Sequence, residues 1–360
     1  MQKVNWTKWN SKDNNFQKTS HIKSVLVYGE PPENQQFISI VILTFKRAHG
    51  LKVALESALA QDYASDFYIT VVDDSGYDKA TDELMQTYCK EYKNIIYYRH
   101  EKNLGQYANW NRACELAPSK WFCLLHDDDW LEPQYLIRVS SVLESNAGEN
   151  LGLLGVYFTT VDQRKNNVQR SLLKKTFDSL ITLFIKMRRG NPIPITLYDN
   201  MRQIYVLSCC LMINRKKVIE IGGLDDLYYP SSDFVLSSKM NYYYSTAFLP
   251  EYLCFRGIGE NESLKREVCE GSIKCAYRHT LAMIETVTPL ISESAKKRKA
   301  SFAAVAAEIG VLGYDDLSYA ETKHELGMKN IYNSKVTRVL LFIKSRFAWG
   351  LLLFRVRSRK

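Results

Sequence analysis

Several features that would assign this 360-residue sequence to common protein classes are missing from it. None of its eight cysteines forms a Cys-x-x-Cys pair, and most lie in apolar or helical contexts, which indicates buried free thiols. No uninterrupted apolar stretch reaches the length of about 18 residues that marks a membrane-spanning helix, and the N-terminus has no hydrophobic secretory segment. We therefore expect a protein of the reducing cytoplasm.

Acidic residues are absent from residues 335–360, where eight basic residues lie. The chain has a formal net charge of +9, so subtracting these eight leaves only +1 for the rest. Basic charge confined to a tail does not predict a nucleic-acid groove across the fold, and no nucleic-acid partner is expected. The tail also holds two apolar clusters, which is typical of an amphipathic helix on an anionic membrane surface or of a terminal helix docked on the main domain.

Short apolar runs alternate with helical patterns through the first half of the chain. The expected strands are residues 37–44, 67–74, 94–100, 120–126 and 151–161. The expected helices between them are residues 47–61, 78–92, 105–117 and 133–146. This alternation predicts an α/β fold with a mostly parallel sheet flanked by helices, in which ligands bind beyond the carboxyl ends of the strands.

The pattern becomes less regular after about residue 165. A basic helical segment is expected at 172–190, and a strand, a helix and a Gly-Gly stop at 203–226. Residues 228–245 place an aspartate at the start of a helix, and residues 264–325 are predicted to be helical. The second half thus predicts a sheet that continues into a C-terminal helical region.

Three consecutive aspartates, Asp127, Asp128 and Asp129, follow the strand at 120–126. Carboxylates this close raise one another's pKa, so a positive ligand is expected beside them. Alternate side chains of an extended stretch point the same way, which would turn Asp127 and Asp129 towards one Mg²⁺ or Mn²⁺ ion. The alternative is an acidic N-cap for the helix that begins near Pro133.

Two further acidic positions lie at ends of predicted elements. Asp73 and Asp74 end the strand at 67–74, where they either form an Asx turn or accept hydrogen bonds from a base or a ribose. Asp233 begins a helix, where it either contributes to a Ser-Ser-Asp cap or acts as a general base for an attacking hydroxyl.

Taken in order, these segments resemble the family 2 glycosyltransferases, which have the GT-A fold. The matching pieces are ISIVILTFKR, ALAQDYASDFYITVVDDSG and NLGQYANWNRACELAPSKWFCLLHDDDWLEPQYL. A fourth, SCCLMINRKKVIEIGGLDDLYYPSSDFVLSSKM, resembles the acceptor-side segment of that family. The resemblance covers about residues 37–256, and its strength lies in the order and spacing of the four pieces.

The resemblance implies a role for each matching residue. Nucleotide-sugar binding is implied for Thr44, Phe45, Arg47, Asp73, Asp74, Asn103, Gly105, Asn111, Asp127, Asp128 and Arg256. The family's DxD motif matches the aspartate cluster, which implies Asp127 and Asp129 as ligands of a divalent cation, Mn²⁺ or Mg²⁺. Asp233 matches the catalytic base, although Ser232 stands where the family usually has a second acidic residue.

One departure concerns the metal. The family often has a histidine after its last strand that joins the cation, and Ile258 stands at that position here. The cation would then rely on aspartate, diphosphate and water. His126 is an alternative donor, and the competing interpretation of His126 is a packing residue at a strand end.

The resemblance implies an inverting enzyme that transfers a sugar, from a UDP-sugar by preference, to a glycan or lipid-linked glycan in surface polysaccharide synthesis. With the basic tail, it implies a cytoplasmic protein held peripherally on the inner face of the membrane. We divide the chain into an N-terminal extension (1–36), packed loosely on or preceding a glycosyltransferase domain (37–263), a helical region (264–334) and the basic tail (335–360). Within the domain, residues 37–161 would bind the nucleotide sugar and residues 162–263 the acceptor.

Two other functions compete with this one. A nucleotidyltransferase also combines an α/β sheet with paired aspartates, but LTFKRAHG is a poor match to the Gly-rich basic loop that it needs. A degenerate carbohydrate-binding or scaffold protein is favoured by the missing histidine and opposed by the complete set of aspartates.

Overall fold

The computed structural model describes most of the chain. The described residues are 4–145, 148–162, 191–203, 209–259, 265–312, 319–329 and 332. The basic helical segment expected at 172–190 and the basic tail at 335–360 lie outside these residues, and so do residues 204–208 and 260–264.

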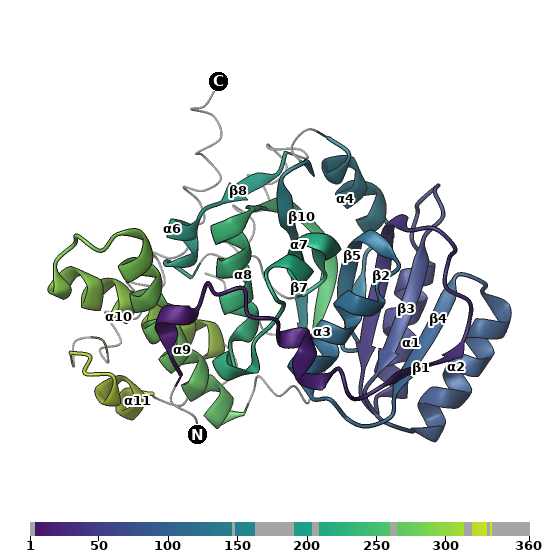
Figure 1. Cartoon of the computed structure of the whole chain (residues 1–360), viewed down its shortest axis with the longest axis horizontal. Helices are drawn as coiled ribbons and strands as arrows, with labels where there is room; N and C mark the ends of the chain where they lie inside the picture. The colour runs from purple at the N-terminus through teal and green to yellow at the C-terminus, as the bar shows by residue number, and fades with distance from the viewer. Residues whose placement is uncertain are drawn as a thin grey trace.

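A ten-stranded mixed sheet forms the centre of the molecule (Figure 1). Its strands are β1 (Ser24–Tyr28), β2 (Gln36–Thr44), β3 (Tyr68–Asp73), β4 (Ile95–His100), β5 (Ser119–His126), β6 (Asp129–Leu131), β7 (Leu151–Asp162), β8 (Ile193–Ile195), β9 (Leu211–Asn214) and β10 (Ser245–Ile258). Their order is β1-β4-β3-β2-β5-β9-β7-β10-β6, with β8 on β10. The run β4-β3-β2-β5 and the pair β7-β10 are parallel, and antiparallel pairing is confined to β1, β6, β8 and β9.

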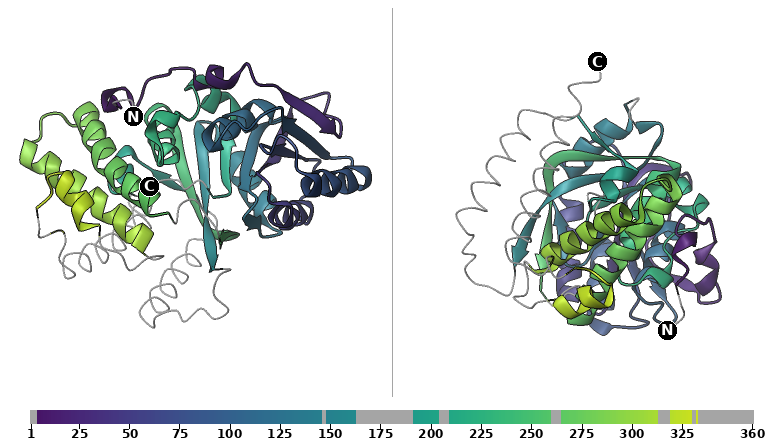
Figure 2. Two further views of the ribbon diagram at one scale, coloured as in Figure 1. Left: turned by 90° about the horizontal axis from the view of Figure 1, so that it is seen from below. Right: turned by 90° about the vertical axis from the view of Figure 1, so that its left-hand side faces the viewer.

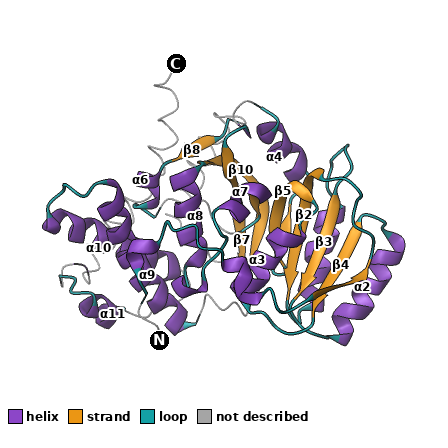
Figure 3. Ribbon diagram, viewed as in Figure 1, coloured by secondary structure: helices purple, strands orange, loops and turns teal. Residues whose placement is uncertain are grey.

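Helices cover both faces of this sheet (Figure 3). They are α1 (Ala48–Leu59), α2 (Lys79–Glu91), α3 (Gln106–Leu116), α4 (Tyr135–Leu143), α6 (Leu197–Asn200), α7 (Arg215–Glu220), α8 (Ser232–Tyr243), α9 (Arg266–Val287), α10 (Glu293–Leu312) and α11 (Ala320–Glu325). The α/β fold with a largely parallel sheet and a helical C-terminal region is therefore confirmed, as are the strands and helices predicted between residues 37 and 161.

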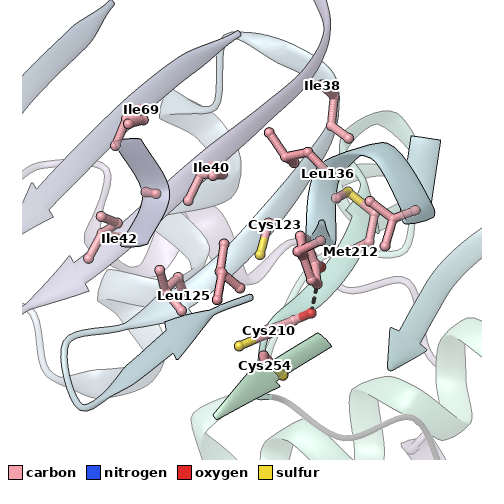
Figure 4. Close-up of a cluster of buried hydrophobic side chains, with 14 of the residues drawn as sticks. Ile38, Ile40, Ile42, Ile69, Cys123, Leu125, Leu136, Cys210, Met212 and Cys254 are labelled. Carbon is pink, nitrogen blue, oxygen red and sulfur yellow. Dashed lines mark hydrogen bonds between the residues drawn. The ribbon is translucent and has the colours of Figure 1, made fainter. Parts of the chain in front are cut away.

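The alternation of side chains along β2 explains why helices are needed on both faces. Ile38, Ile40 and Ile42 pack into one core with α1, α2 and α4, part of which Figure 4 shows. Val41 and Leu43 point to the opposite core, which contains side chains of α3, α7 and α8. A strand buried on both sides needs the continuous apolar run that the sequence shows.

The described part of the N-terminal segment, residues 4–36, packs into the fold. The expectation that this segment packs loosely is therefore wrong. Trp9 is 1% exposed and Phe16 is 7% exposed. β1 extends the sheet antiparallel to β4, with Ser24 opposite His100. Figure 2 shows this segment running along one side of the molecule, from the C-terminal helices to the far edge of the sheet. The apolar spacing in residues 1–36 is too sparse to predict contacts this distant in sequence.

The C-terminal helices α9, α10 and α11 pack at the opposite end of the molecule from β1 (Figure 1). A fully buried ion pair joins α10 to α11, with Lys323 Nζ 2.7 Å from a carboxylate oxygen of Glu308. Within the described part of the chain, none of the helices has the length and apolar character required to cross a membrane.

Lys239 on α8 allows a test of how the N-terminal segment packs. This side chain is buried beneath that segment, where it lines a small cavity with Trp9, Asn15 and Asp225. Burial lowers the pKa of Lys239 to about 8. The folded state therefore has to hold a poorly solvated charge at neutral pH.

We expect Lys239→Met to raise the free energy of unfolding at pH 7 by about 2–3 kcal/mol, because methionine fills the same space without the charge. The unfolded chain keeps its proton up to about pH 10.5 and the folded chain only to about pH 8. Wild type should therefore regain stability relative to the variant as pH rises between these values. Urea unfolding across this range measures the difference, and Lys12→Met, at an exposed lysine of the same region, is the control.

Candidate active site

The carboxyl ends of three neighbouring parallel strands meet at one edge of the sheet. β2 lies between β3 and β5, with Thr44 opposite Asp73 and Leu43 opposite His126. The segments that follow these strands contain most of the predicted site residues. The acidic residues predicted at the ends of the strands therefore lie at one edge of the sheet.

Asp127 holds the segment that follows β2. Its carboxylate accepts hydrogen bonds from Thr44 Oγ1 at 2.9 Å and from the Phe45 N–H at 3.3 Å. Arg47 Nη1 lies 3.4 Å from Asp127 and 3.5 Å from Asp128, and its side chain is 43% exposed. The buried carboxylate of Asp127 thus fixes a turn that presents the exposed Phe45 ring and the Arg47 guanidinium to solvent.

The aspartate cluster forms a turn and not an extended strand. Asp127 and Asp128 lie between the end of β5 and the start of β6, so the alternation expected for a strand does not apply to them. Donor atoms of His126, Asp128 and Asp129 lie within 4.8 Å of one another, and Asp127 is outside this group. The cluster does not cap α4 either, because that helix begins at Tyr135 with Gln134 as its N-cap.

Asp129 is the most constrained member of the group. It is 3% exposed, it accepts a hydrogen bond from the Gly257 N–H at 3.2 Å, and its Oδ2 lies 3.7 Å from His126 Nδ1. Burial raises the pKa of Asp129, while His126 lowers it. Burial lowers the pKa of His126, but the interaction with the Asp129 carboxylate outweighs it and raises the value to about 9. The pair therefore favours an imidazolium beside a carboxylate.

Asp73 and Asp74 both have partners within the protein. Asp73 Oδ1 accepts from the Ser75 N–H at 2.9 Å, which confirms the Asx turn, and Asp73 Oδ2 accepts from the Tyr97 hydroxyl at 2.8 Å. The Asp74 carboxylate accepts from the N–H groups of Leu104 and Gly105 and from Asn103 Nδ2. Burial raises the pKa of Asp74 to about 6, and the two backbone N–H groups counteract it.

The loop that Asp74 holds leads into α3. Gly105, its N-cap, has φ +84°, a left-handed conformation that glycine adopts without a steric penalty. Asn103 and Gly105 therefore contact Asp74, with which they share a predicted role in binding the nucleotide sugar. Contact of these residues with a nucleotide stays a prediction.

We expect Asp74→Ala to lower the free energy of unfolding by about 2–3 kcal/mol, because the Leu104 and Gly105 N–H groups would lose their acceptor. Urea unfolding at neutral pH measures the loss. Asp78→Ala is the matched control, since Asp78 caps α2 through Thr81 and its removal should cost only about 1 kcal/mol. Equal decreases in the free energy of unfolding of the two variants would contradict the prediction that Asp74 stabilises the fold more than a helix cap does.

Asn111 connects α3 to the segment between α7 and α8. Its Nδ2 donates to the Leu224 carbonyl at 2.9 Å, and its Oδ1 accepts from the Leu224 N–H at 2.8 Å. Both polar ends of this buried amide are thus engaged with one residue. The predicted contact of Asn111 with a nucleotide stays a prediction.

Asp233 lies in the first turn of α8, where a negative charge is favourable. The N-cap of α8 is Ser231, whose side chain makes no capping hydrogen bond. Asp233 Oδ1 instead accepts a hydrogen bond from the Phe234 N–H at 2.9 Å, so only the aspartate of the expected Ser-Ser-Asp cap binds a first-turn N–H group. The Asp233 charge raises the pKa of Tyr107, after the larger effect of burial. Because Tyr107 lies in the first turn of α3, Asp233 lies near the same helix end that Asp74 binds.

Arg256 and Ile258 lie at the C-terminal end of strand β10, beside the cluster. In the antiparallel register of β10 and β6, Arg256 lies opposite Asp129, and the neighbouring rings of Phe255 and Trp130 stack with their centroids 5.2 Å apart. Ile258 is 3% exposed. Sequence reasoning missed two neighbours of the site, Tyr107 and Gly257, because no motif distinguishes them from other residues of their helix and strand.

The comparisons with known proteins agree with this architecture. The family model for glycosyl transferase family 2 matches residues 39–221, about half of the chain. An uncharacterized glycosyltransferase of Methanocaldococcus jannaschii is 30% identical over 37% of this chain and 45% of its own length. Glycosyltransferase AglE of Haloferax volcanii is 24% identical over 42% of this chain and 52% of its own length. The chain spans about half the length of these curated relatives.

Solved structures show the same fold. Residues 1–349 of Staphylococcus aureus TarS in complex with UDP superpose with a TM-score of 0.53 at 12% identity, covering 90% of this chain and 92% of that one. The Pyrobaculum calidifontis mannosyltransferase PcManGT, in complex with GDP-Man and Mn²⁺, gives a TM-score of 0.50 at 14% identity, with 90% of each chain covered. The family model matches a region that includes the strand ends, the aspartate turn and the loop bound by Asp74. On the basis of this match, the chain belongs to glycosyl transferase family 2.

Proposed function

We propose that this protein is an inverting glycosyltransferase that transfers a sugar from a nucleoside-diphosphate donor to a hydroxyl group of a glycan or lipid-linked glycan. The observation that carries the proposal is the convergence of Thr44, Asp74 and the aspartate turn at one sheet edge, in a chain of this family. Ligands of parallel α/β sheets bind at this edge.

The donor atoms at the aspartate turn fit a divalent cation. Asp128 and Asp129 offer carboxylate oxygens within 4.8 Å of a ring nitrogen of His126. Because His126 is held as an imidazolium by Asp129, it would bind the cation through that nitrogen only after releasing its proton. Oxygen donors with one imidazole suit Mn²⁺ or Mg²⁺. We assign these three residues to the cation, with His126 in the role that Ile258 cannot fill. When bound, the cation would neutralise charge on the leaving diphosphate.

The neighbouring residues would bind and orient the donor. Asp127 fixes the turn at Thr44 and Phe45, so that the exposed Phe45 ring can lie against a nucleoside. The half-exposed Arg47 guanidinium is able to bind a phosphate oxygen through planar donors. Asp74 fixes the loop at Asn103 and Gly105 beside this turn. These contacts would preorganise the surface that receives the donor.

Asp233 is the proposed general base. It would accept the proton of the acceptor hydroxyl as that oxygen attacks the anomeric carbon from the face opposite the leaving group. A single displacement of this kind inverts the anomeric configuration. The support for this role is that Asp233 lies in the first turn of α8 and that its charge raises the pKa of Tyr107, a residue in the first turn of α3, the helix whose N-terminal loop Asp74 binds.

The donor nucleotide that we propose is UDP. Its support is the likeness of fold to TarS, which was solved with UDP and with UDP-GlcNAc, while the likeness to a GDP-Man enzyme makes GDP the competing choice. We also propose a role in surface polysaccharide synthesis at the cytoplasmic face of a membrane. The basic tail at 335–360 supports the membrane location, because Lys and Arg side chains are attracted to anionic lipid. The division into donor half, acceptor half, helical region and tail stays part of this proposal.

Calorimetric titration of UDP, GDP and dTDP, each with and without Mn²⁺, tests the donor site. We expect cation-dependent binding of UDP. Binding of GDP alone would correct the nucleotide and keep the site. If no nucleotide bound in either condition, the degenerate carbohydrate-binding alternative, which Ile258 favours, would replace the transferase.

A further inference from the structure

Three cysteine thiols gather behind the aspartate turn. Cys209 and Cys210 precede β9, and Cys254 lies in β10, where it pairs with Leu131 of β6. Their sulfur atoms lie within 4.8 Å of one another, and those of Cys209 and Cys210 are 3.6 Å apart. Figure 4 shows Cys210 and Cys254 side by side in the core. All three residues are buried and carry free thiols.

The spacing of these sulfur atoms matches a metal site better than a disulfide. A disulfide requires about 2.05 Å between sulfur atoms. Zinc–sulfur bonds of about 2.3 Å in tetrahedral geometry separate neighbouring sulfur atoms by about 3.8 Å. The contact between Cys209 and Cys210 is already close to that separation, so both thiols can reach one ion with little movement.

The backbone supports the same arrangement. Cys210 has φ +49°, a left-handed conformation that non-glycine residues adopt at a cost. Its carbonyl accepts a hydrogen bond from the buried Tyr135 hydroxyl at 2.7 Å, which fixes the peptide in this conformation. The strained residue is what allows two adjacent cysteines to turn their sulfur atoms towards each other, because adjacent side chains of an extended strand point to opposite faces.

We propose that Cys209, Cys210 and Cys254 form a binding site for a thiophilic divalent metal ion, with Zn²⁺ as the reference ion. Each ligating thiol would release its proton as the sulfur–metal bond forms. Thiolate sulfur selects Zn²⁺ over the hard ions Mg²⁺ and Mn²⁺, so this site and the aspartate turn would take different ions. The inference does not depend on the transferase activity.

The site would stabilise the part of the sheet that carries Asp129. β10 pairs with β6 in the register that places Arg256 opposite Asp129, two residues after Cys254. A metal ion bound by the three thiols would therefore tie β10 to the residues before β9, directly behind the aspartate turn.

Titration of the reduced full-length protein with Co²⁺ and Cd²⁺ tests the site, because thiolate ligands give charge-transfer bands that carboxylate and imidazole ligands do not. We expect one ion per chain in wild type. Cys209→Ser and Cys254→Ser should weaken binding at least about 100-fold, since changes to outer-shell partners alone cost 10–100-fold. Cys114→Ser and Cys275→Ser are matched controls, because both remove buried free thiols elsewhere and should retain the band.

Asp128→Asn/Asp129→Asn should also retain the band, which separates the thiol site from the aspartate turn. Cadmium X-ray absorption on wild type counts the sulfur neighbours directly and requires no variant to fold. Three sulfur neighbours are expected. A wild-type protein without a charge-transfer band, a band that persists in Cys254→Ser, or cadmium without sulfur neighbours would each overturn the proposal.

Discussion

Asp233→Asn is expected to lower kcat by about 10²–10⁴-fold, the range that general-base assistance supplies. Asparagine keeps the size of the side chain and its place in the first turn of α8, but its amide cannot accept the proton of an attacking hydroxyl. Donor binding should remain, because the donor contacts that we propose lie on the segments after β2, β3, β4 and β5. Initial rates with the donor that titration identifies, together with its dissociation constant, measure the two effects separately.

The matched control is Asp226→Asn. Asp226 lies in the short 3-10 helix before α8, is largely exposed, and forms an ion pair with Lys18. Exposed ion pairs contribute only about 0–1 kcal/mol, so this change should leave kcat close to wild type. If Asp233→Asn retained near-normal turnover, or if its donor binding fell in proportion to kcat, Asp233 would not be the base.

The fold was predictable because its signals are local. Each parallel strand between residues 37 and 161 is an apolar run bounded by polar residues, and each helix between them has its own periodicity. Parallel pairing then places all of the strand ends on one edge, so that Asp74 and Asp127 could be brought together without knowledge of any contact. The same reasoning located Asp233 at the start of a helix.

The rest of the site depends on contacts that have no local signature. The turn at Asp127 and Asp128 arises because β6 leaves β5 and pairs with β10, more than 100 residues away in sequence. An extended-strand assumption therefore grouped Asp127 with Asp129, whereas the structure groups Asp128 and Asp129 with His126. Likewise, β1 joins β4 across about 70 residues, which no pattern in the N-terminal segment indicates.

Asp129→Asn and Asp127→Asn are expected to affect cation binding very differently, although the two aspartates are only two residues apart. Asp129 is in the group that we assign to the cation, and asparagine in its place keeps an acceptor for the Gly257 N–H while removing the charge. Loss of a direct ligand should weaken Mn²⁺ binding at least about 100-fold, and cation-dependent nucleotide binding with it.

Asp127→Asn should instead leave Mn²⁺ binding within a few fold of wild type and weaken nucleotide binding with and without the cation. The reason is that Asp127 binds Thr44 and Phe45 and attracts Arg47, so its charge organises the turn that would receive the nucleoside and phosphate. Electron paramagnetic resonance of Mn²⁺ counts bound ions without any nucleotide, and calorimetry measures UDP in both conditions. If both variants lost Mn²⁺ binding equally, Asp127 would also be a ligand of the cation. The aspartate turn would then have to rearrange when the cation binds.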